Sequence, residues 1–457
     1  MDNQNLRFWG PVVLLAVVLW VVRAWATAPP LTLAEAVLLA LKENPGLKAA
    51  GLALPAAEAE VARSRARFLP QVNLLESFNY SDNPSQVFMN KLNQRRFTAQ
   101  DFFLDNLNNP SAYGNFRTGV AVTQPVFQGG EAYLGWQQAR LKKEQAQAQV
   151  LAARQKLIHR VTQAYFARQL AEARLGVIRE AKNTATANRR LIQSLHEAGA
   201  VVRADLLAAD VHLARLTQEE IQAAGQVEVA KSALASAVGL PDIALRPLSP
   251  APKDPAPLPG NLEDLKKVAE EKRPDLKSLS LAAQVAKKEL TKAQLNYLPR
   301  LRVNAEYDLD QRHLFGRGAD SYTVMAVLHL NLFNGLADLA RARQARALAA
   351  QAQEYEREML DAIRHQVTES ALNLKTAHAR LQVARAAVAQ AREGLRLIRL
   401  RYEEGLTLLV DLLTAQDALK EAELNYLAAL FDTHLAQAGL ELALGTLTGP
   451  EAPGEGK

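Results

Sequence analysis

The sequence contains no cysteine among its 457 residues. This excludes thiolate metal sites, disulfide frameworks and lipid attachment to an N-terminal cysteine. It also lacks a concentrated basic face, since the 54 basic residues are interspersed with 48 acidic ones and the net charge is only +6. A nucleic-acid-binding protein gathers its basic residues on one surface, so no nucleic-acid partner is predicted.

Motifs of enzyme chemistry are also missing. There is no Gly-rich phosphate-binding loop and no nucleophile with a paired base. His159 and His365 occupy matching positions, but no second ligand recurs at metal spacing, so we interpret both as solvated helix residues. Asp308 and Asp310 alternate on a predicted strand and fit the lining of a lumen better than a catalytic pair. The sequence predicts no catalysis, no metal and no cofactor.

Long apolar runs are confined to the beginning of the chain. Arg7 precedes an almost wholly apolar run at 11–22, and Ala24-Trp25-Ala26 fits the small-X-small rule for cleavage. This pattern predicts a secretory signal peptide over residues 1–26. The run is shorter than the roughly 20 residues of a spanning helix, which favours export over the alternative of an uncleaved membrane anchor.

An internal repeat organises the rest of the sequence. The motif Phe-X-Gly at 127–129 recurs at 333–335, and Gly199 recurs as Gly405, in both cases 206 positions later. Neither copy contains a proline between these landmarks. We therefore predict two matching helices of about 67 residues, the first over 131–197, each roughly 100 Å long.

The repeat gives a domain organisation. We expect a first repeat over 27–240, a linker over 241–260 with seven prolines, a second repeat over 261–446 and a flexible tail over 447–457. Each repeat is expected to contain two short helices, two strands, one long helix and one shorter helix.

The first repeat sets out this order in detail. Helices are expected at 31–43, 45–68 and 204–238, and strands at 70–80 and 116–127. Pro125 marks an edge or the end of the second strand. Residues 82–115 form a long connection with four phenylalanines, and one hypothesis is that it folds over the mouth of a channel.

The second long helix carries a coiled-coil pattern. An apolar residue recurs at every seventh position from Leu360 to Tyr402, with a second series, including Ile363 and Ile398, three residues later. This spacing is typical of a coiled-coil seam. An ordinary long coiled coil is the simplest explanation for the long helices by themselves.

The predicted strands point to a membrane. In the third strand, apolar residues from Leu301 to Leu309 alternate with polar ones, and about ten such residues cross a bilayer as a tilted barrel strand. Four strands cannot close a barrel, and lipid does not tolerate an open edge. Two copies would give eight strands with a filled interior, and three would give twelve with a passage. The alternative is a small sheet packed on the helices.

Together, these features resemble the TolC-like outer-membrane efflux channel family, over nearly the whole mature chain. The resemblance is carried by several motifs in order. They are Leu-Thr-Leu-Ala-Glu-Ala at 31–36, Asn-Pro at 44–45, Leu-Pro at 69–70 and 298–299, Gln-Pro-Val-Phe at 124–127, Tyr402-X-X-Gly405 and Asp-Leu-Leu-X-Ala-Gln at 411–416.

The resemblance implies a mixed α and β membrane protein with two tandem structural repeats, each of two strands plus long coiled-coil helices. It implies a homotrimer whose twelve-stranded transmembrane β-barrel lies among the lipid of the cell outer membrane and continues as a periplasmic α-helical barrel. It also implies a periplasmic adaptor protein and an inner-membrane pump as partners.

The function expected from this resemblance is a passive exit channel of a tripartite efflux or type I secretion system, carrying small molecules or proteins. The alternative is a periplasmic adaptor or coiled-coil scaffold protein of an export assembly. Two hairpins, each preceded by two strands, favour the channel.

The turns that end the long helices are the first candidate site. Apolar residues crowd both glycines and would form a docking surface for an adaptor if exposed. The alternative is that they pack against one another. The predicted docking residues are Gly199, Ala200, Val201, Val202, Gly405, Leu406, Leu408 and Leu409.

The second candidate site is a channel entrance near the same turns. Asp205 and Asp411 follow the two glycines by six residues, and their alternative role is that of acids in the first turn of a helix. The resemblance implies that Asp411 rings the entrance and sets a preference for cations. Thr414 stands where some members carry another acid. The resemblance also implies that Tyr402 and Asp205 bridge neighbouring helices in a closed tip.

Overall fold

The structure is a computed structural model that describes residues 29–250 and 260–449. The predicted signal peptide lies outside the described residues, as do most of the linker and the end of the tail. The chain forms two compact units, which are described separately. One comprises 1–52, 148–276 and 358–457, and the other comprises 53–147 and 277–357.

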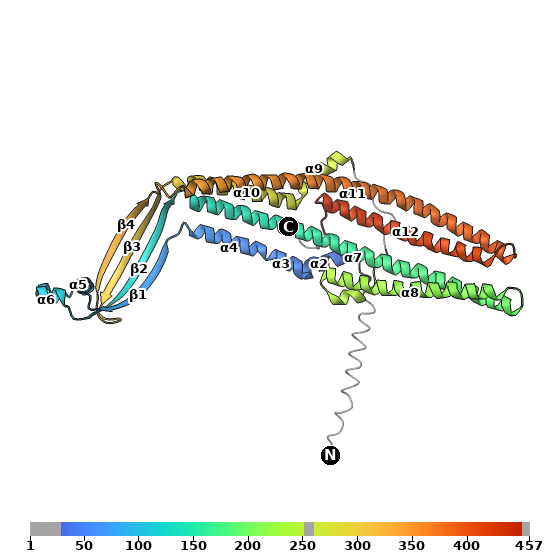
Figure 1. Cartoon of the computed structure of the whole chain (residues 1–457), viewed down its shortest axis with the longest axis horizontal. Coiled ribbons are helices and arrows are strands. Elements are labelled where there is room, and N and C mark those ends of the chain that lie inside the picture. Colours follow the sequence, from blue (N-terminus) through green and yellow to red (C-terminus); the bar gives the residue numbers. More distant parts are fainter. Residues whose placement is uncertain (1–28, 251–259, 450–457) are drawn as a thin grey trace, which may run out of the picture. The chain divides into compact units, whose positions relative to one another are not determined.

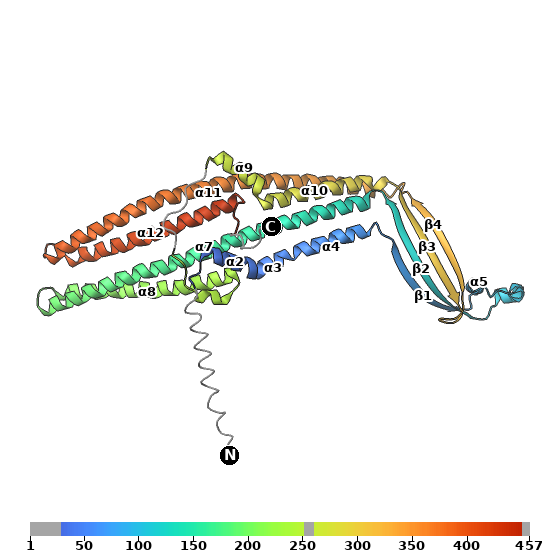
Figure 2. The same cartoon turned by 180° about the vertical axis from the view of Figure 1, so that it is seen from behind.

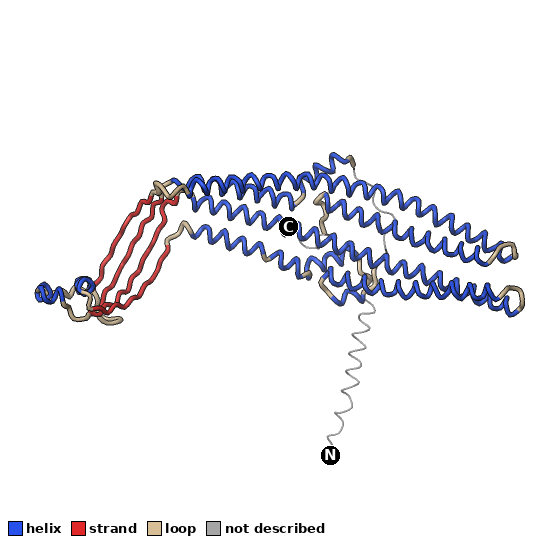
Figure 3. Tube along the Cα trace, viewed as in Figure 1, coloured by secondary structure: helices blue, strands red, loops and turns tan. Residues whose placement is uncertain are grey.

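A four-stranded antiparallel sheet forms part of the second unit (Figure 1, Figure 3). Its strands are β1 (Gln71–Ser81), β2 (Tyr113–Gln128), β3 (Arg300–Gln311) and β4 (Ala319–His329), in the order β1-β2-β3-β4. Two strands from each half of the sequence are therefore joined in one sheet, and β1 and β4 are its unpaired edges.

The register places apolar side chains on one face of this sheet. Leu74, Val120, Tyr307 and Tyr322 lie opposite one another across the four strands. Because successive side chains of a strand point to opposite faces, every second row of paired residues lies on this same face. The predicted alternation is thus confirmed. Glu76 interrupts the apolar face and accepts a hydrogen bond from the Thr118 hydroxyl.

The opposite, polar face carries charged and amide side chains. Its rows include Asn115, Arg117, Glu306, Asp308 and Asp310. The Asp308 carboxylate lies over Gly119, since a Cβ at residue 119 would be 2.7 Å from its Oδ1, and glycine leaves room for this side chain.

The apolar face of the sheet is left exposed in the single chain, whereas Asn115 and Asp310 on the polar face are buried. Leu74 is 75% exposed and Tyr322 is 81% exposed. A sheet is normally stabilised by packing its apolar face against another layer, and the exposure of these side chains indicates that none of the described residues forms such a layer here.

The prediction for β2 needs one correction, because the strand begins at Tyr113 rather than Phe116. Of the two roles predicted for Pro125, that of an edge is the one observed, since β1 no longer pairs with β2 there and a register shift opposite β3 follows. Pro125 follows the last β2 residue paired with β1, which is Thr123. Its missing N–H therefore costs the ladder with β1 nothing.

The connection over residues 82–115 is largely helical, which the prediction of a long connection did not specify. It contains α5 (Pro84–Asn93), the 3-10 helix η1 (Ala99–Phe102) and α6 (Leu104–Asn108). Asn83 caps α5 by accepting hydrogen bonds from the backbone N–H groups of Ser85 and Gln86.

Helices make up the rest of the sheet-containing unit. They are α4 (Ala53–Ala66), most of α10 (Pro274–Gln294), η3 (Leu295–Tyr297), the first part of α7 (Glu131–Glu197) and the first part of α11 (Ala337–Glu403). The single helix predicted over 45–68 is instead two, α3 (Pro45–Gly51) and α4. Pro55 lacks the N–H that would continue the first helix across this boundary.

The unit that comprises 1–52, 148–276 and 358–457 is called the helical unit. It contains two antiparallel hairpins (Figure 1, Figure 2). The second part of α7 pairs with α8 (Arg203–Val238), and the second part of α11 pairs with α12 (Leu409–Ala443). The two long helices contain 67 residues each, and their bounds differ by 206 positions. Both long helices are therefore confirmed.

The coiled-coil seam is confirmed by burial. Ile363, Val367 and Leu374 are fully buried and pack with α9 (Leu262–Lys272) and the end of α12. Later seam positions such as Leu395 and Tyr402 are half-buried. The regular spacing keeps the same stripe of α11 facing its partner helix.

A second hydrophobic core contains residues from the first described segment, from the predicted linker and from the predicted tail. Leu31, Val161 and Tyr165 are buried with residues of α2 (Leu33–Glu43) and η2 (Pro241–Leu245). Leu31 also forms a parallel bridge with Leu248, so this part of the linker is ordered. Leu447 is buried in the same core, so the predicted tail begins too early.

Across residues 29–250 and 260–449, the helices include none long and apolar enough to span a membrane.

Candidate functional site

The two helical turns have the same geometry. Gly199 has φ +76° and Gly405 has φ +72°. Beyond Gly199, the Ala200 N–H donates to the Leu195 carbonyl at 2.8 Å, and beyond Gly405 the Leu406 N–H donates to the Arg401 carbonyl at 2.8 Å. This six-to-one hydrogen bond with a left-handed residue is the Schellman motif. Glycine supplies that conformation without strain.

Large apolar side chains are exposed at both turns. Val202 is 65% exposed, Leu406 is 62% exposed and Leu408 is 70% exposed. Val202 and Leu408 stand at the N-cap positions of α8 and α12. They therefore leave apolar surface in water at the same point of each hairpin.

Leu409 does not share this exposure. It is only 5% exposed and packs with Ile192, Ala209 and Leu412. Val201 is half-buried against the same cluster. The expectation of exposed turn residues is therefore corrected for Leu409, because the first turn of α12 directs that side chain inward. Mutual packing, the alternative, applies to Leu409 and Val201.

Tyr402 and Asp205 are close in space although they belong to different hairpins. Tyr402 packs on the apolar cluster at the turns. Burial, together with the negative charge of Asp205, raises the pKa of the Tyr402 hydroxyl. Asp205 therefore lies near enough to act on it, although no hydrogen bond joins these two described side chains.

Asp411 caps the start of α12. Its Oδ2 accepts hydrogen bonds from the Thr407 hydroxyl at 2.6 Å and from the Leu408 N–H at 3.3 Å. The residue is nevertheless exposed, so its carboxylate remains in contact with solvent. The Thr414 hydroxyl donates to the Val410 carbonyl at 2.7 Å, so that side chain is held on its own helix.

A groove runs beside these turns within the helical unit. It has a volume of about 250 Å³ and lies between α7 and the helices of the second hairpin. Its wall includes Asn188, Leu191, Arg396, Arg399 and Tyr402. The arginines are paired, since Arg396 contacts Glu393 and Arg399 contacts Glu403, so the groove is not a strong anion site.

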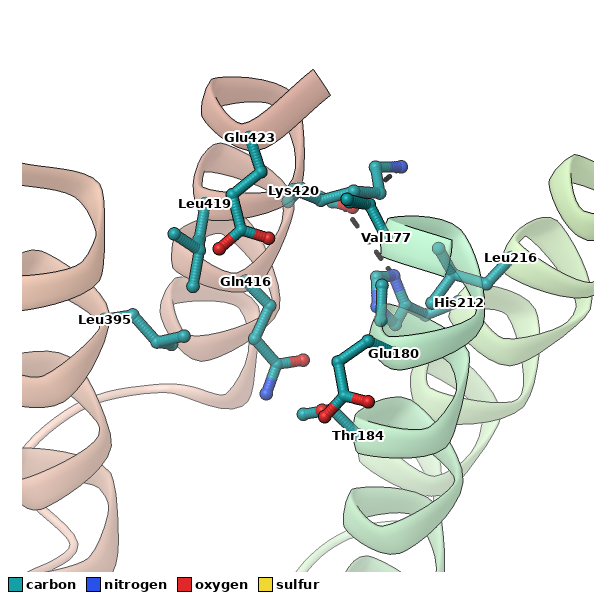
Figure 4. A pocket seen from close by; sticks show the side chains of 12 residues that line it. Val177, Glu180, Thr184, His212, Leu216, Leu395, Gln416, Leu419, Lys420 and Glu423 are labelled. Atoms are coloured by element: carbon teal, nitrogen blue, oxygen red, sulfur yellow. Dashed lines mark ion pairs between the residues drawn. The ribbon is translucent and has the colours of Figure 1, made fainter. Parts of the chain in front are cut away.

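A charged network that the sequence did not predict lies between the two hairpins (Figure 4). Lys420 of α12, with a side chain only 4% exposed, pairs with Glu219 of α8 at 2.7 Å. It also lies 3.5 Å from Asp417, which pairs with Arg215 and lies 3.9 Å from Nδ1 of buried His212. The sequence did contain a hint of this network. Lys420 follows Leu412 and Gln416 at intervals of four residues, which places all three on one face of α12, the face that is turned inward.

The two matched histidines do not form a metal site. Among residues 29–250 and 260–449, no three His, Cys, Asp or Glu side chains gather as metal ligands would. His365 is exposed, as expected. His159 is half-buried, so the expectation of a solvated side chain was wrong. Burial lowers the pKa of His159, against a smaller opposing effect of the Ala438 backbone.

Comparisons with known proteins give the family. A profile of the outer membrane efflux protein family matches residues 37–240 and 265–446. Alkaline protease secretion protein AprF of Pseudomonas aeruginosa is 27% identical, over 90% of this chain and 83% of AprF. Outer membrane protein TolC of Vibrio cholerae is 24% identical, over 91% of each chain.

A solved structure has the same fold. The Campylobacter jejuni CmeC outer membrane channel matches with a TM-score of 0.79 and 18% sequence identity, over 91% of this chain and 85% of CmeC. The resemblance to TolC-like channels is therefore confirmed, and the adaptor alternative is set aside because the family profile matches both halves. The chain belongs to the outer membrane efflux protein family, and it is a channel of the cell outer membrane rather than an enzyme.

Proposed function

We propose that three copies of this chain assemble into a passive exit channel with a twelve-stranded barrel in the outer membrane. The observation that carries this proposal is the sheet with two unpaired edges, β1 and β4. An edge exposed to lipid leaves backbone N–H and C=O groups without partners, at several kcal/mol each. The edges must therefore be paired by other copies of the chain.

The strand directions permit this closure. All neighbours in the sheet are antiparallel, and an even number of strands leaves β1 and β4 running in opposite directions. A β1 edge that meets the β4 edge of the next copy continues the antiparallel pattern. Three copies give twelve strands, which leave a passage, whereas eight strands are filled by side chains.

The two faces of the sheet suit the two surroundings of such a barrel. The apolar face, with exposed Leu74 and Tyr322, would meet lipid. The polar face would line the lumen. There the Arg117 guanidinium donates to Asp308, with Nε–Oδ1 at 2.9 Å, and to Glu306 at 2.9 Å. These contacts satisfy the charges without closing the passage.

The helical turns would dock a periplasmic adaptor that links the channel to an inner-membrane pump. Exposed Val202, Leu406 and Leu408 provide apolar surface at both turns of each subunit. The rigid Schellman turns present these side chains in a fixed position, which lowers the entropic cost of binding.

The same region would form the entrance. In a trimer, three exposed copies of Asp411 would stand around the axis and attract cations. Thr414 supplies no second ring of charge. Tyr402 and Asp205, which already lie close within one chain, would support the closed tip.

A polypeptide cargo is one candidate for transport. AprF is an alkaline protease secretion protein, and it aligns with 90% of this chain. A channel that serves type I secretion would pass an unfolded protein, whereas an efflux channel would pass small molecules. Co-expression with a secreted protease or with a drug pump would distinguish the two cargo classes.

The central test is reconstitution of the purified protein into a planar bilayer, with its mass measured in detergent. A species of three chain masses with discrete single-channel conductance is expected. A monomer that remains stable without detergent and produces no conductance would contradict the proposal.

A further inference from the structure

The segment between β1 and β2, residues 82–112, is a small folded element that we call the cap. Its centre is aromatic, since the rings of Phe88 and Phe97 meet edge to face at 4.7 Å and those of Phe97 and Phe102 at 5.0 Å. Val87 is 2% exposed, and Lys91 pairs with Asp101 at 2.6 Å. The cap therefore has a defined shape rather than that of an extended loop.

The cap is anchored on the polar face of the sheet. The Gln94 side chain, which is buried, donates to Oδ1 of Asn115 at 2.8 Å and to the Gly114 carbonyl at 3.0 Å, and it accepts from the Tyr113 hydroxyl at 2.8 Å. Asn115 in turn donates to Asp310. Because Asn115 and Asp310 belong to the polar face, these bonds hold the cap toward the lumen of the proposed channel.

The cap also reaches both edges of the sheet. It begins directly after β1, which is one edge. The Arg95 guanidinium donates to the Asp320 backbone carbonyl at 2.8 Å, near the start of β4, which is the other edge. In an assembly closed through β1 and β4, each cap would therefore adjoin both subunit boundaries.

The cap exposes three consecutive apolar residues, which form what we call its exposed side. Phe102 is 65% exposed, Phe103 is 66% exposed and Leu104 is 77% exposed. Lipid does not suit this surface, because Gln94 holds the cap on the face turned away from lipid. Because the cap lies beside both edges of the sheet, the caps of neighbouring copies would bring the same apolar surface close to it.

We propose that the exposed side of each cap, residues 102–104, packs against the caps of the neighbouring copies and narrows the outer mouth of the channel. This inference rests on the proposed trimer. The contact would bury apolar surface that a single chain leaves in water. The mouth would then be narrowed by apolar contact between copies, separately from any closure at the helical turns.

The absence of cysteine allows a direct test. The variants Phe102→Cys, Phe103→Cys and Leu104→Cys each carry one thiol per chain, so any disulfide must join two copies. Under oxidation, at least one is expected to give a band of twice the chain mass, because a disulfide requires Cα atoms within about 7 Å. Leu314→Cys, exposed in the turn between β3 and β4, is the matched control. Cross-linking in none of the three variants, or equally in the control, would overturn the proposal.

A conductance measurement gives an independent readout. Replacing Phe102, Phe103 and Leu104 together by serine should raise the single-channel conductance, since the caps lose their contact. Unchanged conductance in a confirmed trimer would refute the cap proposal and leave the trimer intact. A protein that is not trimeric in detergent would refute the proposed assembly instead.

Discussion

Lys420 and Glu219 form an ion pair that ties the second hairpin to the first, with Nζ and Oε2 2.7 Å apart. The Lys420 side chain is buried, whereas the two carboxylates near it, those of Glu219 and Asp417, are partly exposed to water. A buried cation of this kind is retained only when carboxylates surround it. The pair therefore fixes the relation of α8 to α12 in the helical unit.

Removing this cation should destabilise the helical unit. Lys420→Met removes the closest cation of Glu219 and leaves Asp417 with Arg215 alone. It is expected to cost about 2 kcal/mol, less than breaking a fully buried pair, because water reaches both acids. Thermal unfolding in detergent measures the loss. Lys231→Met is the control, since Lys231 pairs with the exposed Glu228 and should change stability by less than about 1 kcal/mol. Equal losses in the two variants would argue against a special role for Lys420.

Stability should decrease in mild acid because of His212. Burial lowers the pKa of this side chain below its ordinary value of 6.5, and the opposing attraction of Asp417 is smaller. The unfolded chain therefore takes up a proton near pH 6.5 while the folded chain remains neutral. The stabilising contribution is present above pH 6.5 and is lost as the pH decreases toward the folded pKa.

The variant His212→Gln should reduce this pH dependence. The slope of unfolding free energy between pH 6.5 and 5 should decrease by up to about 1.4 kcal/mol per pH unit. His159 contributes with the same sign, so some slope should remain. Stability curves of the variant and the parent that run parallel below pH 6.5 would show that His212 does not titrate in this way.

The turn glycine should be sensitive to any side chain. Gly405→Ala meets no atom within 4 Å, but it forces alanine to adopt φ +72°, at a cost of about 1–2 kcal/mol. Gly394→Ala, with equally open surroundings inside α11, should instead stabilise the helix by up to about 1 kcal/mol. Calorimetry of both variants tests whether backbone conformation rather than crowding requires the glycine.

The docking proposal predicts that Leu408 is needed for transport but not for the stability of the fold. Leu408→Asp introduces a charge on an exposed N-cap residue, where aspartate is a favourable cap. Efflux or secretion in cells should be lost while the trimer and its thermal stability remain. Leu408→Met, which keeps the apolar surface, should remain active. Full activity of Leu408→Asp would remove this residue from the docking surface.

The entrance proposal predicts opposite shifts from two substitutions. Asp411→Asn keeps an oxygen that can accept from Thr407 and Leu408 but removes the charge, so the cation preference of single channels should decrease. Thr414→Asp adds a charge one turn later and should increase it. Reversal potentials in a salt gradient measure both effects, and an unchanged potential in Asp411→Asn would place its charge outside the conduction path.

The sequence by itself determined the local elements. The long helix over residues 131–197 was predicted with its observed bounds. Its continuation depends on the absence of proline and its end on a glycine, and both effects are local to a few neighbouring residues. The alternation from Leu301 to Leu309 likewise determined which face of β3 is apolar, since side-chain direction follows directly from strand geometry.

Tertiary structure decided which neighbour each side chain meets. Leu408 and Leu409 are adjacent leucines, yet one is exposed and the other is buried, because the first turn of α12 directs only the second toward Ile192. Lys420 and Glu219 are 201 positions apart, and only the packing of two hairpins brings them together. Such contacts depend on segments distant in the chain, so local sequence patterns do not contain them.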